Sequence, residues 1–206
     1  MRLAQPLDDL LQNRSHVKVL RALTALPEGV ESSIREIARR ADISHPTAGN
    51  VLQSLERQGL VNARRSLFAD EYRLNRRHEL SGKLIRIFEW ETALRDTLIG
   101  FLRDHLAKRA PWIEEAYLFG SAARGNMRPD SDLDVAVICD AGHASAVEDV
   151  LHDISELTAA RFGNKIGYVI GTRPIDEITR SGQSGSRVWR AVQKEGIRFW
   201  PAEGEN

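Results

Sequence analysis

Cysteine is almost absent from the chain, which has Cys139 alone among its 206 residues. A disulfide within the chain is therefore excluded, and a zinc site built from several thiolates is disfavoured. No apolar run approaches the roughly 18 residues that cross a bilayer, and the first residues lack the apolar core of a signal peptide. These absences predict a soluble cytoplasmic protein with no membrane partner.

Net charge is absent as well, because 29 Lys and Arg residues balance 29 Asp and Glu residues. The balance hides an uneven distribution. Residues 1–80 hold 13 basic and 10 acidic side chains, a net +3, whereas residues 111–206 hold 10 and 15, a net −5. The N-terminal part is the better candidate for a polyanionic partner.

Apolar spacing in the N-terminal part predicts three helices and a hairpin, over residues 15–26, 33–41, 44–58 and 60–75. Ser15 and Ser33 are the expected N-caps, the third helix is expected to start near Ser44, and Gly59 is its expected end. The order helix, helix, turn, helix and hairpin resembles the winged-helix repressors of bacteria and archaea over residues 10–77. The turn Asp42-Ile43-Ser44 and the helix end from Leu55 to Val61 carry this resemblance.

The resemblance implies that the third helix enters the major groove of double-stranded DNA. The amides of Asn50 and Gln53 suit adenine, while His45 and Thr47 lie near the helix N-terminus, where backbone N–H groups bind phosphate. Basic side chains on the wing and on the second helix are expected at DNA phosphates: Arg64, Arg65, Arg39 and Arg40. A winged helix used for protein contact is the alternative. Gly49 allows two explanations, close approach to DNA or packing.

A long amphipathic helix is predicted over residues 81–108. Its apolar face either packs on the cores of the protein or forms a homodimer interface, and the pattern alone leaves both open. The predicted domain boundary lies at its start, which gives a winged-helix domain over 1–82 and a second domain over 83–206, led by helix 83–108.

The second domain contains Leu118-Phe119-Gly120-Ser121, and then Asp130-Ser131-Asp132-Leu133-Asp134 at the start of a strand. This pattern resembles the minimal nucleotidyltransferases of the polymerase-β superfamily over residues 90–200. The resemblance implies a mixed β-sheet flanked by helices, so the whole chain is predicted to be α+β. It also implies a nucleoside triphosphate site at Gly120, Ser121, Arg124 and Ser131.

Asp132 and Asp134 are the predicted catalytic and metal-binding residues. Two residues apart on a strand, they project from one face about 7 Å apart, as carboxylates that share Mg²⁺ require. The family usually has a third carboxylate on the strand after the next helix. Gly167 stands at that position here, and only Asp176 and Glu177 follow it as acids in that region.

Three hypotheses on function remain from the sequence. The first is a transcriptional regulator whose nucleotidyltransferase-like domain binds Mg-nucleotide and alters DNA affinity. The second is an active Mg²⁺-dependent enzyme that transfers a nucleoside monophosphate to a protein, a small molecule or RNA. The third is a pseudoenzyme that serves assembly. Loss of a general base costs on the order of 10²–10⁴ in rate, which favours the first over the second.

Overall fold

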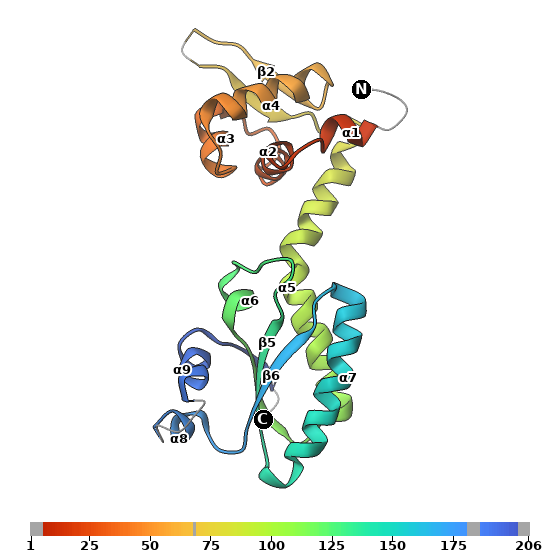
Figure 1. Cartoon of the computed structure of the whole chain (residues 1–206). Coiled ribbons are helices and arrows are strands. Elements are labelled where there is room, and N and C mark those ends of the chain that lie inside the picture. The colour runs from red at the N-terminus through yellow and green to blue at the C-terminus, as the bar shows by residue number, and fades with distance from the viewer. Residues whose placement is uncertain (1–5, 68, 181–185, 202–206) are drawn as a thin grey trace. The chain divides into compact units, whose positions relative to one another are not determined.

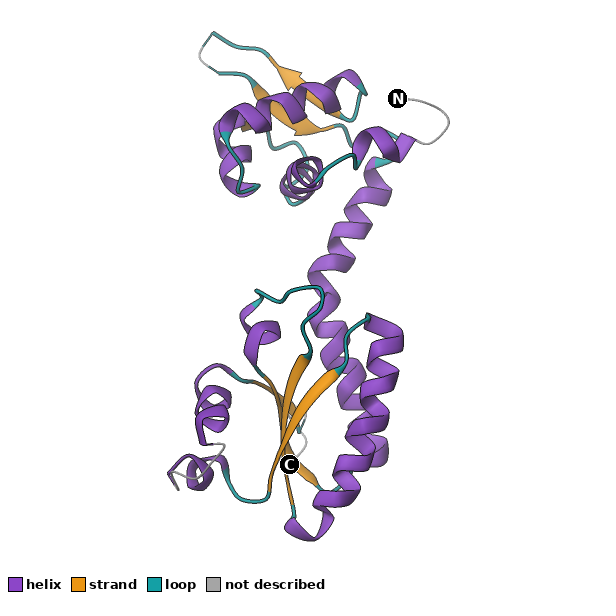
Figure 2. Cartoon of the chain, in the orientation of Figure 1, coloured by secondary structure: helices purple, strands orange, loops and turns teal. Residues whose placement is uncertain are grey.

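A computed structural model describes residues 6–67, 69–180 and 186–201 (Figures 1 and 2). The chain divides into two compact units, Met1–Ala93 and Leu94–Asn206. The division falls inside helix α5, which spans Ser81–Arg109. The sequence predicts the boundary at residues 82 and 83, nearer the start of the same helix.

The first unit contains the predicted helices and hairpin. Its helices are α1 (Pro6–Leu10), α2 (Arg14–Thr24), α3 (Ile34–Arg40), α4 (His45–Arg57) and the start of α5. Its strands are β1 (Ser32–Ser33), β2 (Val61–Arg64) and β3 (Glu71–Leu74), which form an antiparallel sheet in the order β1-β3-β2. The short elements α1 and β1 carry too few residues to show a period, and the sequence did not predict them.

Side chains cap the first turns of these helices. Ser33 accepts the N–H of Glu36, so that predicted cap is confirmed, and Ser44, where the third helix was expected to start, caps α4 by accepting the N–H of Thr47. The prediction for Ser15 is wrong, because Asn13 caps α2 instead and accepts the N–H groups of Ser15 and His16. An asparagine outside the apolar pattern caps the helix two residues before the predicted cap.

The core of the first unit lies among its helices and its sheet. Apolar side chains from α2, α3, α4, the hairpin and the start of α5 fill it, including Leu20, Ile37, Leu52, Tyr72 and Phe88. This packing fixes the orientation of α4, and with it the orientation of its exposed face, because the buried face of α4 packs against the other helices and the hairpin.

The second unit is a four-stranded mixed sheet with helices on both faces. Its strands are β4 (Ile113–Leu118), β5 (Leu133–Cys139), β6 (Ile166–Gly171) and β7 (Ile197–Trp200), in the order β6-β5-β4-β7. Strands β5 and β6 are parallel, and the other pairs are antiparallel. The helices are the end of α5, α6 (Gly120–Arg124), α7 (Ala144–Phe162), α8 (Ile175–Arg180) and α9 (Ser186–Glu195), with a 3-10 turn at Ala141–His143.

Alternation along β5 assigns the two faces of this sheet. Val135 and Val137 join the core formed with α5 and α7, whereas Ala136 and Ile138 pack with Trp189 and Val192 of α9. Figure 1 shows α7 on one side of the strands and α8 and α9 on the other. Asp132, Asp134 and Ala136 are spaced by two residues, so the two aspartates project from the same face as Ala136, which α8 and α9 cover. They lie at the N-terminal end of β5.

Helix α5 contributes to both cores, with Leu84 and Phe88 in the first unit and Leu98, Leu102 and Leu106 in the second. The expectation of a core-facing helix is met at these positions. Ile87 and Trp90 remain 55% and 59% exposed, and they are the part of the apolar face left for a further contact. Within the described part of the chain, no helix combines the length and apolar character needed to span a membrane.

Candidate functional site

The turn from β4 into α6 brings the backbone against a carboxylate. Gly120 has φ +67°, and a Cβ placed on it would lie 2.1 Å from Oδ2 of Asp134. The N–H of Phe119, just before it, donates to the carbonyl of Asp134 at 2.9 Å. Two features require glycine at position 120. Its backbone is in the left-handed region, and the Asp134 carboxylate occupies the space that a side chain would take.

The carboxylate of Asp134 is half-buried beside that of Asp132, which is exposed. Burial raises the pKa of Asp134 above its ordinary value of 3.8, the negative charge of Asp132 raises it further, and Arg124 lowers it. A cation bound between the two carboxylates would relieve this repulsion.

Gly167 occupies the position that faces both aspartates. It is the register partner of Asp134 in the parallel β5–β6 pair. A Cβ on Gly167 would lie 3.7 Å from Cβ of Asp132 and 3.8 Å from Oδ1 of Asp134, which is ordinary van der Waals contact. A side chain at this position would therefore project toward the carboxylate pair without a clash.

The residues present fit one divalent cation but do not fit two. Mg²⁺ in proteins is commonly held by one or two carboxylates together with substrate phosphates, which Asp132 and Asp134 could provide. A second ion would need further protein ligands. In residues 6–67, 69–180 and 186–201, no cluster of three or more His, Cys, Asp or Glu side chains could hold a metal ion.

The predicted DNA-reading residues lie on α4. His45, Asn50 and Gln53 are exposed, and Thr47 is half-buried. The hydroxyl of Thr47 lies 2.7 Å from that of the cap Ser44, so it is engaged within the helix start. The two amides and His45 are left for an external partner.

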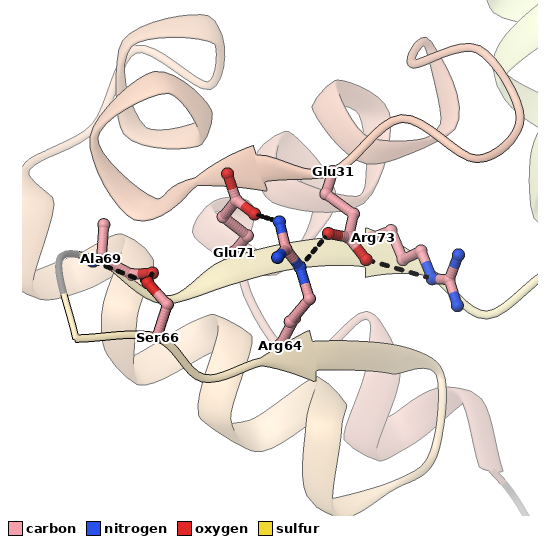
Figure 3. A network of polar contacts seen from close by, with 6 residues as sticks. All are labelled: Glu31, Arg64, Ser66, Ala69, Glu71 and Arg73. Carbon is pink, nitrogen blue, oxygen red and sulfur yellow. Dashed lines mark hydrogen bonds and ion pairs between the residues drawn. The ribbon is translucent and has the colours of Figure 1, made fainter.

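The predicted wing arginines lie within ion pairs of the protein itself. Arg64 bonds to Glu31 and to Glu71, and Arg73 lies 3.8 Å from Glu31 on the other side (Figure 3). Arg65 pairs with Glu56 at 2.6 Å and with Asp70 at 2.8 Å.

Arg65 also donates to the hydroxyl of Tyr72 at 2.7 Å. On the second helix, Glu36 holds both Arg39 and Arg40 at 2.7 Å. A DNA phosphate would compete with these carboxylates for the charge of the arginines.

Comparisons with known families assign the two units. A family model described as Polymerase beta, Nucleotidyltransferase matches residues 103–177, and a model of the MarR family matches residues 13–66. The chain joins a MarR-type winged-helix domain to a polymerase-β-type nucleotidyltransferase domain. Both predicted families and the predicted α+β fold are confirmed, in the predicted order.

Among solved structures, the chain is similar to a toxin-antitoxin structure with AMP-PNP, at 20% identity and TM-score 0.35, over 50% of this chain and 72% of that one. It is similar to a fragment of a possible transcriptional regulatory protein from Mycobacterium bovis, at 28% identity and TM-score 0.29, over 46% and 99%. It is also similar to the archaeal chromatin protein TrmBL2, at 15% identity and TM-score 0.27, over 85% and 70%. No curated protein matches the chain.

In the nucleotidyltransferase domain, the predicted phosphate ligands have different surroundings. Arg124 pairs with Glu195 at the end of α9. The hydroxyl of Ser131 accepts the N–H of Arg128 at 3.3 Å and so stabilises the loop before β5. Ser121 is half-buried in α6, and no side chain caps the first turn of that helix.

Two residues near the aspartates were not predicted. Asn164 donates to the carbonyls of Pro129 and Ser131, which fixes the loop that delivers Asp132. Lys165 pairs with Glu156, which raises the pKa of its amine, and the charge of Asp132 raises it further. Lys165 lies two residues before Gly167, so both positions project from the same face of the sheet. This spacing is the sequence signal that could have identified Lys165.

The distant acids do not replace the missing carboxylate. Asp176 lies on α8, beyond the end of β6, and its Oδ1 accepts a hydrogen bond from Gln193 at 2.6 Å. Gly167 and Gly171 are separated by about 13 Å along the strand, so α8 begins at the opposite end of the sheet from the aspartates.

Proposed function

We propose that the chain is a DNA-binding transcriptional regulator whose nucleotidyltransferase domain binds a nucleotide with one Mg²⁺ and has lost efficient transfer. The observation that carries this proposal is the glycine at position 167. Its missing side chain would face Asp132 and Asp134, where a third carboxylate would hold a second cation and serve as a general base.

The retained half of the site supports nucleotide binding. Gly120 allows Asp134 to lie against the first turn of α6, where uncapped N–H groups are available to phosphate oxygens. Bound Mg²⁺ would neutralise the charge of those oxygens. Asp132 and Asp134 would hold it, and Asn164 would keep the Asp132 loop in position.

Nucleotide binding would act on DNA affinity only if the nucleotide prefers one state of the protein. Helix α5 packs in the cores of both domains, so a change in its packing is the simplest connection between them. We expect the DNA affinity of the protein to change when Mg-nucleotide is added.

The test is calorimetric titration of the purified chain with ATP and with GTP, with and without Mg²⁺. We expect binding that requires Mg²⁺, and we expect Asp132→Asn to remove it. Asp130→Asn is the matched control, because it neutralises an exposed acid two residues earlier and should leave binding unchanged. Absence of binding to both nucleotides would overturn the proposal.

An active nucleotidyltransferase is the second candidate, favoured by the intact arrangement of Gly120, Asp132 and Asp134. Transfer of label from a radiolabelled nucleotide distinguishes it. Transfer that Asp132→Asn abolishes would establish the enzyme and replace the first proposal.

A further inference from the structure

The winged-helix domain has a groove beside α4 that none of the predicted wing contacts uses. Its volume is about 490 Å³, and it runs between the start of α2 and one side of α4. Residues 12–16 form one wall, and Thr47, Asn50, Val51, Ser54 and Arg57 form the other.

The α4 wall is one stripe of the helix. Thr47, Asn50, Ser54 and Arg57 are separated by three, four and three residues, so they lie on a single side. The stripe includes Asn50, which is predicted to read a base. The other side of α4 carries Glu56, which holds Arg65 of the wing. The groove and the wing therefore lie on opposite flanks of the same helix.

The charges on these flanks differ. On the wing side, Arg64, Arg65 and Arg73 lie against four carboxylates, those of Glu31, Glu56, Asp70 and Glu71. The groove has no acidic residue in its lining, and it contains Arg14 and Arg57, which are both exposed. Neither arginine has a carboxylate partner among the residues that the structure describes.

The positive character of the groove comes from these two arginines. The N–H groups of Ser15 and His16 at the start of α2 are already accepted by Asn13, so the helix end offers little to an anion. The ring of His16 is buried, and burial lowers its pKa, which disfavours a positive charge on the ring.

We propose that this groove, through Arg14 and Arg57, receives the phosphate backbone of the DNA strand beside α4. The proposal rests on the proposed DNA-binding function. The major groove is about 12 Å wide and is bordered by a phosphate strand on each side, so a helix inside it has phosphates on both flanks. One flank of α4 presents arginines paired with carboxylates of the protein. The other presents Arg14 and Arg57, which have no carboxylate partner in the described part of the chain, although Arg57 donates to the carbonyl of Gln53 at 3.4 Å.

The experiment measures binding of a mixed-sequence DNA duplex over a series of salt concentrations. The affinity of a protein for duplex DNA falls with salt by a slope of about 0.9 for each phosphate contact. We expect Arg14→Ala and Arg57→Ala each to reduce the slope by about that amount, and the double variant by about twice as much.

Three variants serve as controls. Arg57→Lys keeps the charge and should keep the slope. Arg86→Ala removes an exposed arginine of α5, outside the groove, and should leave the slope unchanged. Arg64→Ala with Arg65→Ala tests the wing, and we expect a smaller change than for the groove pair.

The outcomes separate the two proposals. If the wild type shows steep salt dependence and the Arg14 and Arg57 variants keep it, the groove proposal is overturned and the proposed DNA binding is retained. Loss of slope in the wing variant alone would also overturn it. A wild type that does not bind duplex DNA would overturn both proposals.

Discussion

The wing and the aspartate pair place acidic side chains in opposite surroundings. In the wing, each of four carboxylates forms an ion pair with an arginine of the same domain, namely Glu31, Glu56, Asp70 and Glu71. In the nucleotidyltransferase domain, Asp132 and Asp134 lie beside each other. The nearby cations are engaged elsewhere, Arg124 with Glu195 and Lys165 with Glu156.

The comparison indicates where an external partner is needed. A surface ion pair within a domain contributes little stability, about 0–1 kcal/mol, and it already neutralises part of the charge that would attract a ligand. Carboxylates that repel each other instead gain from a cation supplied from outside. Unbalanced charge is therefore our reason for proposing the aspartate pair and the α2–α4 groove as binding surfaces, and for ranking the balanced wing below them.

The largest expected effect comes from completing the aspartate pair. Gly167→Asp would place a third carboxylate in the space beside Asp132 and Asp134. If its absence limits transfer, we expect label transfer from a nucleotide to rise by about 10²–10⁴-fold, the contribution of a general base. Incorporation of radiolabel with Mg²⁺ present measures it.

Gly167→Asn is the control, because it has nearly the same size and no charge. We expect the aspartate variant to gain thermal stability when Mg²⁺ is added and the asparagine variant to gain less. A rise in transfer with both variants would show that filling the space, rather than adding a carboxylate, is responsible.

A second prediction concerns the contact between Gly120 and Asp134. Gly120→Ala introduces a Cβ into the space of the carboxylate and displaces it, so we expect the affinity for Mg-nucleotide to fall by about 10–100-fold. Gly125→Ala is the matched control. Its φ is +72°, similar to that of Gly120, but its Cβ would meet open space.

Both alanine variants should lose stability, since a left-handed non-glycine residue costs about 1–3 kcal/mol. Thermal unfolding measures this loss, and titration with Mg-nucleotide measures the affinity. Equal losses of affinity in the two variants would mean that backbone strain alone, and not the carboxylate contact, explains the result.

The smallest expected effect is on the melting temperature. It compares Asp134, a carboxylate beside another carboxylate, with a wing carboxylate that is paired with an arginine. The folded state raises the pKa of Asp134, so the stability gained from its protonated form is present below the ordinary pKa of 3.8 and is lost as pH rises through the raised value. We therefore expect Asp134→Asn to raise the melting temperature without nucleotide at neutral pH. The difference should shrink as pH falls through the raised pKa and should be lost below 3.8.

Glu71→Gln in the wing should show the opposite sign or no change, because it removes a partner of Arg64 at an exposed pair worth about 0–1 kcal/mol. Melting curves of both variants over a pH series provide the comparison. A lower melting temperature for Asp134→Asn at neutral pH would mean that the fold satisfies this carboxylate after all.

Periodicity predicted most of the elements because their apolar residues recur over several turns or strand positions. Strand β5 was predicted over the residues that the structure assigns to it, and α4 and α5 within one residue of their ends. Helices α1 and α8 and strand β1 span 5, 6 and 2 residues, too few for a period to appear.

The sequence by itself determined the two families, the order of the domains, the aspartate pair and the absence of an acid near Gly167. Each of these depends on residue type and local spacing, which the chain carries without folding. Only the tertiary structure decided which charges meet. Arg64 is 33 residues from Glu31, and Arg124 is 71 residues from Glu195, so no local pattern relates them. Because electrostatic pairing depends on distance in space, the sequence could name the arginines but could not say which of them remain free.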